Sequence, residues 1–385
     1  MNFFPEKLEK IEPSGIRELF SKAKGKANVI SLGIGAPDIN TPDGLKEALK
    51  DAVFNNFNNY DLTPGNKEFR EAITRNYKED YGVDYSSEEG VIVGCGGVQI
   101  IYVALQTYLT PGDEVLLQAP CFLTYPRQVV LAGGKIVWMP STEDFSIDIE
   151  KTKESITDKT KFIFLNFPSN PTGAVMTREE LKAIVDLAVD NDIFILSDEV
   201  YEYYTYDDNK HVHIASIDDA YEKTITVNSF SKTFAIPGWR MGFGVTTPDI
   251  LRPILRYHTY IIANATTPMQ IALANFMHTK EAKEFKKYVK NEFQTRRNTI
   301  VDGFNSIDGV KCKRPKGSFY CYANVEETKY SDGKDFSERA FEDADVVVVP
   351  GTEFGPNQDN YIRASFGSVS VPQIEEVVDR FKNIL

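Results

Sequence analysis

Seven short apolar runs recur between residues 90 and 245, and they constrain the possible folds more than any other feature of the chain. Each run is rich in Val, Ile, Leu and Phe, as buried β-strands are, and together they occupy 90–93, 114–118, 135–139, 161–166, 193–197, 224–228 and 241–245. Helical patterns lie at 98–109 and 178–190, the second with Thr177 as its expected N-cap and Glu180 at the capping-box position. Because strands that alternate with helices form mainly parallel sheets covered on both faces, the sequence predicts an α/β fold with a large seven-stranded sheet.

After about residue 268 the short apolar runs give way to long charged helical stretches. Long charged helical stretches occupy 270–277 and 280–304, followed by the run Gly317-Ser318-Phe319-Tyr320 and a strand at 346–349. A chain of 385 residues is also long enough for roughly two domains. We therefore expect a large domain over 46–275 and a smaller α/β domain formed by 1–45 together with 276–385.

The charge balance limits the partners of this chain. It has 43 basic and 56 acidic residues and a formal net charge of −13, so we expect neither nucleic acid nor an anionic membrane to bind. No run approaches the roughly 20 apolar residues of a membrane span, and the start of the chain matches no signal or transit peptide. The four cysteines and four histidines show no metal-ligand spacing. We therefore expect a cytoplasmic protein with buried, reduced thiols and no metal site.

Lys232 lies in the run 229–234, eight residues before Arg240 and 34 residues after Asp198. An isolated lysine is usually a solvated surface residue. Here 225–228 reads as the end of a buried strand and 229–232 as the loop that follows it, which is where α/β folds keep catalytic groups. Pyridoxal phosphate needs a lysine amine for a Schiff base, a carboxylate at its ring nitrogen, and cations with amide donors around its phosphate. The spacing therefore indicates that Lys232 is the lysine of a pyridoxal-phosphate enzyme.

A carboxylate and an amide are available at neighbouring strand ends. Asp198 stands where the apolar run 193–197 stops, and a carboxylate held there would keep the ring nitrogen protonated. The alternative, that Asp198 merely caps the next helix, stays open from the residues alone. Tyr201 can reach the same edge of the cofactor if the segment turns. Asn170 is presented from a turn stiffened by two prolines, for which a plain turn is the alternative.

A glycine-rich run offers a site for a phosphate group. Gly94-Cys95-Gly96-Gly97 opens the 98–109 helix, where bare amides and the helix dipole favour an anion. The run is not a dinucleotide fingerprint, because Gln99 replaces its third glycine. The guanidinium of Arg240 can hold a multi-oxygen anion in a bidentate geometry that lysine cannot match. These residues form the expected phosphate cradle.

Six ordered segments together resemble the class I family of fold type I pyridoxal-phosphate aminotransferases, in its aspartate and aromatic aminotransferase subgroup. The segments are 32–38, 60–65, 170–173, 198–201, 229–240 and 361–363, and the similarity covers nearly the whole chain. The resemblance implies the fold of that family, with a large seven-stranded, mainly parallel sheet domain and a smaller α/β domain. It also implies pyridoxal 5′-phosphate as the cofactor and a homodimer whose two active sites are shared between subunits.

The resemblance gives each matching residue an expected role. Lys232, Asp198 and Tyr201 are the expected catalytic residues: Lys232 carries the cofactor, Asp198 pairs with its ring nitrogen, and Tyr201 and Asn170 bind its ring hydroxyl. The other expected cofactor contacts are Gly97, Val98, Phe122, Ser229, Arg240 and, from the partner subunit of each site, Tyr60. The expected substrate-binding residues are Gly35, Asn170 and Arg363: Arg363 takes the substrate α-carboxylate, and Gly35 lines the same pocket. Many relatives carry a hydroxyl where this chain has Val98, so the phosphate is expected to depend more on Ser229, Arg240 and main-chain donors.

The expected reaction is a ping-pong transamination between an α-amino acid and a 2-oxo acid, with the Lys232 amine as general base. The segments 14–20 and 30–35 resemble archaeal aromatic aminotransferases, and the apolar side chains of Ile16 and Val98 favour an aromatic or mixed donor over aspartate alone. The usual acceptor, 2-oxoglutarate, needs a group for its distal carboxylate. No single arginine can be assigned to that role, so the preferred donor and acceptor stay open.

Alternatives from other functional classes are also open at this stage. A carbon-sulfur lyase or a ring-forming synthase would use the same cofactor residues. A transcriptional regulator on this fold would need a DNA-binding helical domain, for which we expect no room. A nicotinamide-dependent dehydrogenase would need a different cofactor, which an absorbance spectrum distinguishes.

Overall fold

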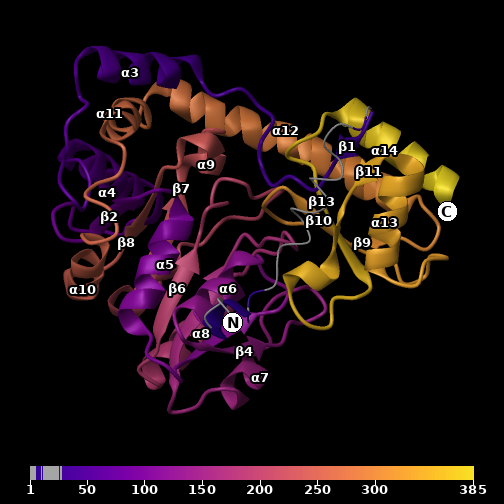
Figure 1. Ribbon diagram of the computed structural model, residues 1–385, viewed down its shortest axis with the longest axis horizontal. Coiled ribbons are helices and arrows are strands. Elements are labelled where there is room, and N and C mark those ends of the chain that lie inside the picture. The colour runs from indigo at the N-terminus through magenta and orange to yellow at the C-terminus, as the bar shows by residue number, and fades with distance from the viewer. Residues whose placement is uncertain (1–5, 10, 12–25, 27) are drawn as a thin grey trace, which may run out of the picture.

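The computed structural model describes residues 6–9, 11, 26 and 28–385 (Figure 1); Ile16 and the segment 14–20 lie outside them. Its largest sheet has the strand order β2-β8-β7-β6-β5-β3-β4. These strands are β2 (Val91–Gly94), β3 (Glu114–Gln118), β4 (Lys135–Met139), β5 (Thr160–Asn166), β6 (Phe194–Asp198), β7 (Thr224–Ser229) and β8 (Gly242–Val245). All neighbouring pairs are parallel except those of β8, which is antiparallel to β2 and β7. The predicted seven-stranded, mainly parallel sheet is confirmed.

Helices cover both faces of this sheet, because successive side chains of a buried strand point to opposite faces. Phe162 and Phe164 of β5 pack into one apolar cluster with α5 (Gly97–Tyr108), α6 (Thr124–Leu131) and α10 (Pro248–His258). Ile163 and Leu165 pack into another cluster, with α8 (Arg178–Asp190) and α7 (Ile149–Glu154). Three further helices share an apolar cluster with β2 and β8: α3 (Asp43–Phe54), α4 (Lys67–Tyr81) and α11 (Thr267–Phe276). Of these, α4 packs against β2, and α11 packs against α3 and α4.

The C-terminal part of the chain forms a second α/β layer with its own apolar core. Its antiparallel sheet has the order β12-β13-β10-β9, and a two-stranded parallel sheet pairs β1 with β11. The strands are β1 (Ile30–Ser31), β9 (Lys311–Cys312), β10 (Tyr320–Asn324), β11 (Val346–Val347), β12 (Val349–Pro350) and β13 (Tyr361–Ser365), and the helices are α12 (Lys280–Asn305), α13 (Gly333–Ala344) and α14 (Val371–Ile384). In Figure 1, α12 runs from the region of α3 and α11 to this second part.

Two local predictions were wrong. The strand expected at 346–349 is divided, because β11 pairs with β1 whereas β12 pairs with β13 of the other sheet. The segment expected as a loop at 229–232 continues β7 through Ser229 and then forms the one-turn helix α9 (Phe230–Thr233), whose N-cap is Ser229. Lys232 is therefore held by a hydrogen-bonded turn rather than by an open loop.

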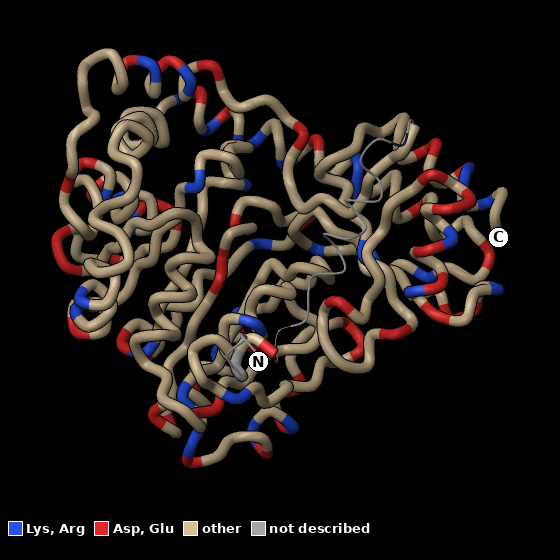
Figure 2. Tube along the Cα trace, in the orientation of Figure 1, with Lys and Arg blue, Asp and Glu red and all other residues tan. Residues whose placement is uncertain are grey.

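The structure also bears on the predicted capping box, on the cysteines and on the expected absence of a membrane span. The capping box of α8 is confirmed, since Thr177 Oγ1 accepts a hydrogen bond from the Glu180 amide at 3.2 Å and Glu180 Oε2 accepts one from the Thr177 amide at 2.7 Å. All four cysteines are free, but Cys95 is only half-buried. None of the helices that the structure describes is long and apolar enough to cross a membrane. Figure 2 shows acidic and basic residues alternating along outer helices such as α3 and α13.

The remaining short elements connect these layers. They are α1 (Glu6–Glu9) and the 3₁₀ helices η1 (Ile214–Ser216), η2 (Tyr221–Lys223), η3 (Pro237–Trp239) and η4 (Gly351–Phe354). The segments that follow β6 and β7 meet at the carboxyl edge of the large sheet, where parallel strands bring their ends together and ligands usually bind.

Candidate active site

A cavity of about 400 Å³ lies at this edge, between the large sheet and the strands β10 and β13. It is lined by every residue that the sequence predicted for the site of one chain: Gly35, Gly97, Val98, Phe122, Asn170, Asp198, Tyr201, Ser229, Lys232, Arg240 and Arg363. Tyr60 does not line it. The structure therefore brings together residues that are spread over more than 300 positions of the sequence.

Lys232 projects into this cavity from α9. Its Nζ donates a hydrogen bond to the Gly35 carbonyl, and its own carbonyl accepts one from the Tyr204 hydroxyl at 2.6 Å. Burial, together with the charges of Arg363 and Arg240, lowers the pKa of Lys232 to about 8. The amine therefore loses its proton far more readily than a surface lysine, as a nucleophile or general base requires.

Asp198 is the last residue of β6 and is buried. Its Oδ2 accepts a hydrogen bond from the Tyr125 hydroxyl at 2.8 Å, and its Oδ1 accepts one from the Val200 amide at 3.2 Å. Burial raises the pKa of Asp198 to about 6, although both hydrogen bonds oppose the rise. The segment after Asp198 is a turn and not a helix, so the alternative that Asp198 only caps a helix is wrong. Its Oδ2 is instead hydrogen-bonded to Tyr125 of α6, and both residues line the cavity.

Tyr125 is a residue that the sequence did not point to. It is fully buried on α6, and its ring lies 4.4 Å from that of Phe164 in β5. Its partner Asp198 is 73 residues away, so no local spacing could have shown the hydrogen bond. The nearest signal was its place three residues after Phe122 in the expected ring-stacking segment.

Arg363 approaches the cavity from β13 in the second sheet. Its Nη1 donates to Asn170 Oδ1 at 3.0 Å and its Nη2 donates to the Gly33 carbonyl at 2.7 Å, while its buried Nε has no partner among the residues that the structure describes. The guanidinium carbon lies over the rings of Tyr320 and Phe354, at 4.6 and 4.9 Å from their centroids. A fixed, desolvated guanidinium with an unpaired donor is suited to a carboxylate ligand.

The phosphate cradle is built from the start of α5 and from Arg240. Gly96 precedes this helix with a φ of +84°, and a Cβ added there would overlap the Arg240 guanidinium, so only glycine fits. Arg240 is exposed and donates to the Pro237 carbonyl at 2.9 Å. Ser229 Oγ donates to the Met241 carbonyl at 2.9 Å and lies 2.8 Å from Ser231 Oγ. Cations, hydroxyls and amides are thus gathered at one end of the cavity, as an anionic group requires.

The two predicted tyrosines, Tyr201 and Tyr60, lie in opposite environments. Tyr201 is buried, and its hydroxyl lies 2.9 Å from the hydroxyl of Tyr320. Burial holds the pKa of Tyr201 well above its usual value, so this phenol stays protonated and can donate a hydrogen bond. Tyr60, by contrast, is 88% exposed, so it is not a buried structural tyrosine of its own chain.

A cluster of buried polar side chains lies next to Asp198 in the segment that follows β6. Glu199 Oε2 lies 2.8 Å from both His211 Nε2 and His213 Nδ1, and Glu202 Oε1 accepts a hydrogen bond from Asn228 Nδ2 at 2.9 Å. Burial acts to raise the pKa of Glu199, but the two histidines hold it below its usual range. Because Glu199 and Glu202 lie one and four residues after Asp198, their hydrogen bonds hold the segment that carries it.

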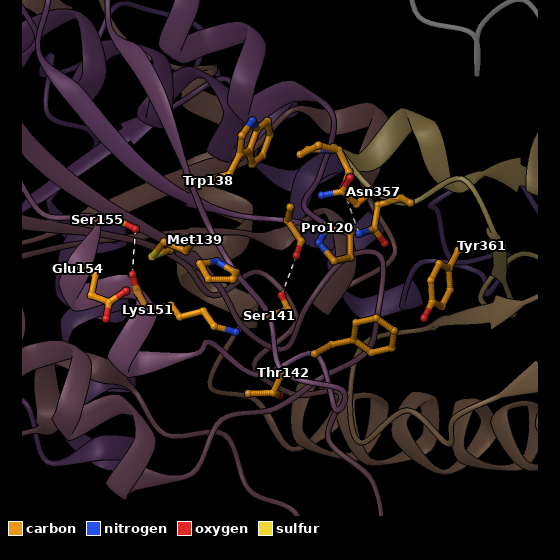
Figure 3. A pocket seen from close by; sticks show the side chains of 15 residues that line it. Pro120, Trp138, Met139, Ser141, Thr142, Lys151, Glu154, Ser155, Asn357 and Tyr361 are labelled. Atoms are coloured by element: carbon orange, nitrogen blue, oxygen red, sulfur yellow. Dashed lines mark hydrogen bonds between the residues drawn. The ribbon is translucent and has the colours of Figure 1, made fainter.

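A second, larger cavity of about 700 Å³ lies elsewhere, with no lining residue in common with the first. Figure 3 shows Lys151 and Glu154 on one side of it and Asn357 and Tyr361 on the other. Lys151 is exposed and paired with Asp148 at 3.0 Å, so no buried charge points into this cavity from α7. We assign no chemistry to it.

Comparison with known proteins decides the family. A model of the aminotransferase class I and II family matches residues 27–381. The chain belongs to this family. It is therefore an aminotransferase, and the family uses pyridoxal phosphate as its cofactor. The comparisons give no support to a lyase or to a nicotinamide-dependent dehydrogenase.

Individual relatives agree over almost the full length of this aminotransferase. An aromatic-amino-acid aminotransferase of Thermococcus litoralis is 38% identical, over 99% of this chain and 97% of its own. An aspartate aminotransferase of Pyrococcus horikoshii is 39% identical, over 100% and 97%. Among solved structures, the aspartate aminotransferase of Thermus thermophilus with maleate superposes with a TM-score of 0.94 at 30% identity, over 100% of both chains. An aromatic aminotransferase of P. horikoshii gives 0.90 at 35% identity, over 96% and 98%.

Proposed function

We propose that this aminotransferase binds pyridoxal 5′-phosphate in the 400 Å³ cavity and transfers the amino group of an aromatic or aspartate-type amino acid to a 2-oxo acid. The observation that carries the proposal is the presence in one cavity of Lys232, Asp198 and two arginines, Arg240 and Arg363. Each of these groups matches a different part of the cofactor or the substrate.

The residues fit the cofactor at each of its functional groups. Lys232 would hold its carbonyl carbon, Asp198 its ring nitrogen, and Tyr201 and Asn170 its ring hydroxyl, while Phe122 would contact the ring. Ser229, Arg240 and the amides of Gly97 and Val98 would hold its phosphate. When bound, the cofactor supplies an electron sink for the negative charge that develops at the substrate α-carbon.

The chain's own groups would perform the remaining steps. Arg363, with Asn170 and Gly35 beside it, would orient the substrate α-carboxylate and so direct the α-hydrogen toward Lys232. The Lys232 Nζ, freed by the incoming amino acid, would accept the α-proton, and its low pKa of about 8 supports this role. The two half-reactions follow one another at the same site, which gives ping-pong kinetics.

The wall of the cavity favours a bulky apolar donor. Ile34 and Val98 line the cavity with side chains that are 43% and 39% exposed, and Phe122 and Leu123 lie on the same wall. Exposed apolar groups at a binding site are covered most favourably by an apolar ligand. We propose 2-oxoglutarate as the acceptor, because it is the usual acceptor of this group of enzymes.

We also propose that the protein is a homodimer with shared sites. Phe54 and Leu62 are large exposed apolar residues close to Tyr60 in the sequence, and Tyr260 and Ile261 are exposed in the segment that precedes α11. The two segments that carry them are tied together, since Thr267 Oγ1 donates to the Asn59 carbonyl at 2.9 Å. An apolar surface of this kind is typical of a subunit interface. Tyr60 would then reach the site of the partner subunit.

The proposed location is the cytoplasm, with small amino and oxo acids as partners and no nucleic acid or membrane. The proposed domains are 46–275 and 1–45 with 276–385. This division is supported by the position of its second boundary, which falls where α11 ends and just before α12 begins.

An absorbance spectrum and a substrate panel test the function. The purified protein should be yellow after incubation with pyridoxal 5′-phosphate, and Lys232→Ala should abolish the lysine-linked absorption band. Asp198→Ala should keep some cofactor but lose most turnover, since the ring nitrogen is no longer held protonated. Twenty amino acids paired with 2-oxoglutarate, pyruvate and oxaloacetate would identify the donor and the acceptor. A colourless protein that cannot be reconstituted would overturn the proposal.

A further inference from the structure

Tyr320 links two parts of the site that the sequence did not connect. It is the first residue of β10, it is buried, and it lines the same cavity as Lys232. Its hydroxyl lies 2.9 Å from the hydroxyl of Tyr201, and its ring lies 4.6 Å from the guanidinium carbon of Arg363. One side chain therefore contacts a residue expected at the cofactor and a residue expected at the substrate.

The hydrogen bond between the two phenols has a defined direction once a ligand is bound. A phenol has one hydrogen to donate, and either hydroxyl can be the donor in the structure. If Tyr201 donates its hydrogen to the ring hydroxyl of the cofactor, only Tyr320 can be the donor of the bond between them. A phenol that accepts a hydrogen bond is polarised and donates more strongly in turn.

The aromatic ring of Tyr320 contacts the guanidinium of Arg363. The guanidinium is buried, and its carbon lies over the rings of both Tyr320 and Phe354. Contact with an aromatic face stabilises a desolvated cation and fixes its plane. A Cβ added to Gly35 would overlap the Tyr320 hydroxyl, so the substrate-side loop also packs on this residue.

We propose that Tyr320 is a positioning residue with two separable roles: its hydroxyl strengthens the hydrogen bond that Tyr201 donates to the cofactor, and its ring holds Arg363 for the substrate carboxylate. This inference rests on the proposed function, and it extends that function to a residue of the second sheet. It makes Tyr320 the link between cofactor chemistry and substrate binding.

The test uses three variants of the holoenzyme. Tyr320→Phe removes only the hydroxyl, and Tyr320→Leu also removes the aromatic face. Tyr322→Phe is the matched control, because Tyr322 is a buried tyrosine two residues along β10 whose hydroxyl donates to Gln358 Oε1 at 3.0 Å instead. The readouts are the pH midpoint of the cofactor absorption change, and kcat and KM measured separately.

We expect Tyr320→Phe to raise the pH midpoint by about half a unit to one unit, because a ring oxygen that receives weaker hydrogen bonding holds the neighbouring proton more tightly. Its KM should stay within about twofold of wild type, since the aromatic face remains. Tyr320→Leu should show the same shift and, in addition, a KM about tenfold higher or more. Tyr322→Phe should change neither the midpoint nor KM.

Other outcomes separate the two proposals. A wild-type protein that takes up no cofactor overturns the proposed function and this inference together. A holoenzyme whose midpoint is identical in wild type and Tyr320→Phe overturns the hydroxyl role alone. If Tyr320→Leu and Tyr320→Phe have the same KM, the ring does not position Arg363.

Discussion

Burial shifts the pKa values of Lys232 and Asp198 in opposite directions, and both shifts weaken the fold. The pKa of Lys232 falls to about 8 and that of Asp198 rises to about 6, with burial as the largest cause in each case. The charged form of each group is more stable in water than in the folded protein. Burying the two groups therefore lowers the free energy of unfolding. Such costs are characteristic of active sites, where function needs groups with altered acidity.

The cofactor-free Lys232→Met variant should therefore be more stable than the wild type at pH 7. A lysine whose folded pKa lies below its ordinary 10.5 binds protons less tightly in the folded state, so its cost is fully present below about pH 8 and disappears as the pH rises past 10.5. We expect a gain of about 1 to 3 kcal/mol at pH 7, measured by urea unfolding. A gain that persists unchanged at pH 10.5 would point to packing rather than charge.

Arg363 offers a second prediction, this time about specificity. In the proposed function the Arg363 guanidinium binds the α-carboxylate that all amino acids share, so its loss should affect every donor alike. Arg363→Lys keeps the charge but loses the paired hydrogen bonds, and kcat/KM should fall by about two to three orders of magnitude, or about 3 to 4 kcal/mol. Steady-state kinetics with tyrosine, phenylalanine, aspartate and glutamate would check this. Activity lost with the acidic donors alone would show that Arg363 binds a distal carboxylate instead.

Which site residues could be predicted depended on how local their signals were. Asp198 ends a buried strand, whereas Lys232 and Asn170 follow one, and their flanking residues mark all three in the sequence. Tyr125 and Tyr320 carry no such mark, because their partners Asp198 and Tyr201 lie 73 and 119 residues away. Their roles depend on how the helices and the second sheet pack, which no single segment encodes.

At the scale of elements, the strands of the large sheet were predictable because burial on both faces leaves continuous apolar runs. The short strands of the second sheet were harder to predict. β11 and β12 follow one another within a single apolar run, 346–349, but pair with different sheets. Hydrophobicity locates such residues in the core, whereas only the pairing partners, β1 and β13, decide where the strand divides.

The capping box of α8 allows a prediction at this scale. Thr177→Ala removes the side-chain acceptor for the Glu180 amide, and the helix should lose about 1 kcal/mol of stability. Thermal unfolding of the purified variant would measure the loss as a decrease in Tm, while kcat should not change because α8 is outside the cavity. An unchanged Tm would mean that packing of α8 against the sheet alone determines its start.

At the scale of the whole molecule, the proposed homodimer would cover the exposed side chain of Tyr60. The side chain is 88% exposed and lies outside its own chain's cavity, yet it belongs to one of the six segments that resemble the family. Exposed tyrosine next to exposed Phe54 and Leu62 is a costly arrangement for a monomer in water. These observations support the proposal that each active site is shared between two chains, and Tyr60 is the residue that tests it.

Hybrid dimers test this sharing directly. We expect Tyr60→Ala to lower activity about tenfold or more and Lys232→Ala to abolish it. In a heterodimer of the two variants, purified through two different tags, one site would combine Lys232 of the first chain with Tyr60 of the second, and both are intact. Such a dimer should recover about half of the wild-type activity, because a two-fold dimer has two equivalent sites. If Tyr60 instead belonged to the active site of its own chain, both sites of the heterodimer would carry a substitution. Its activity would then not recover.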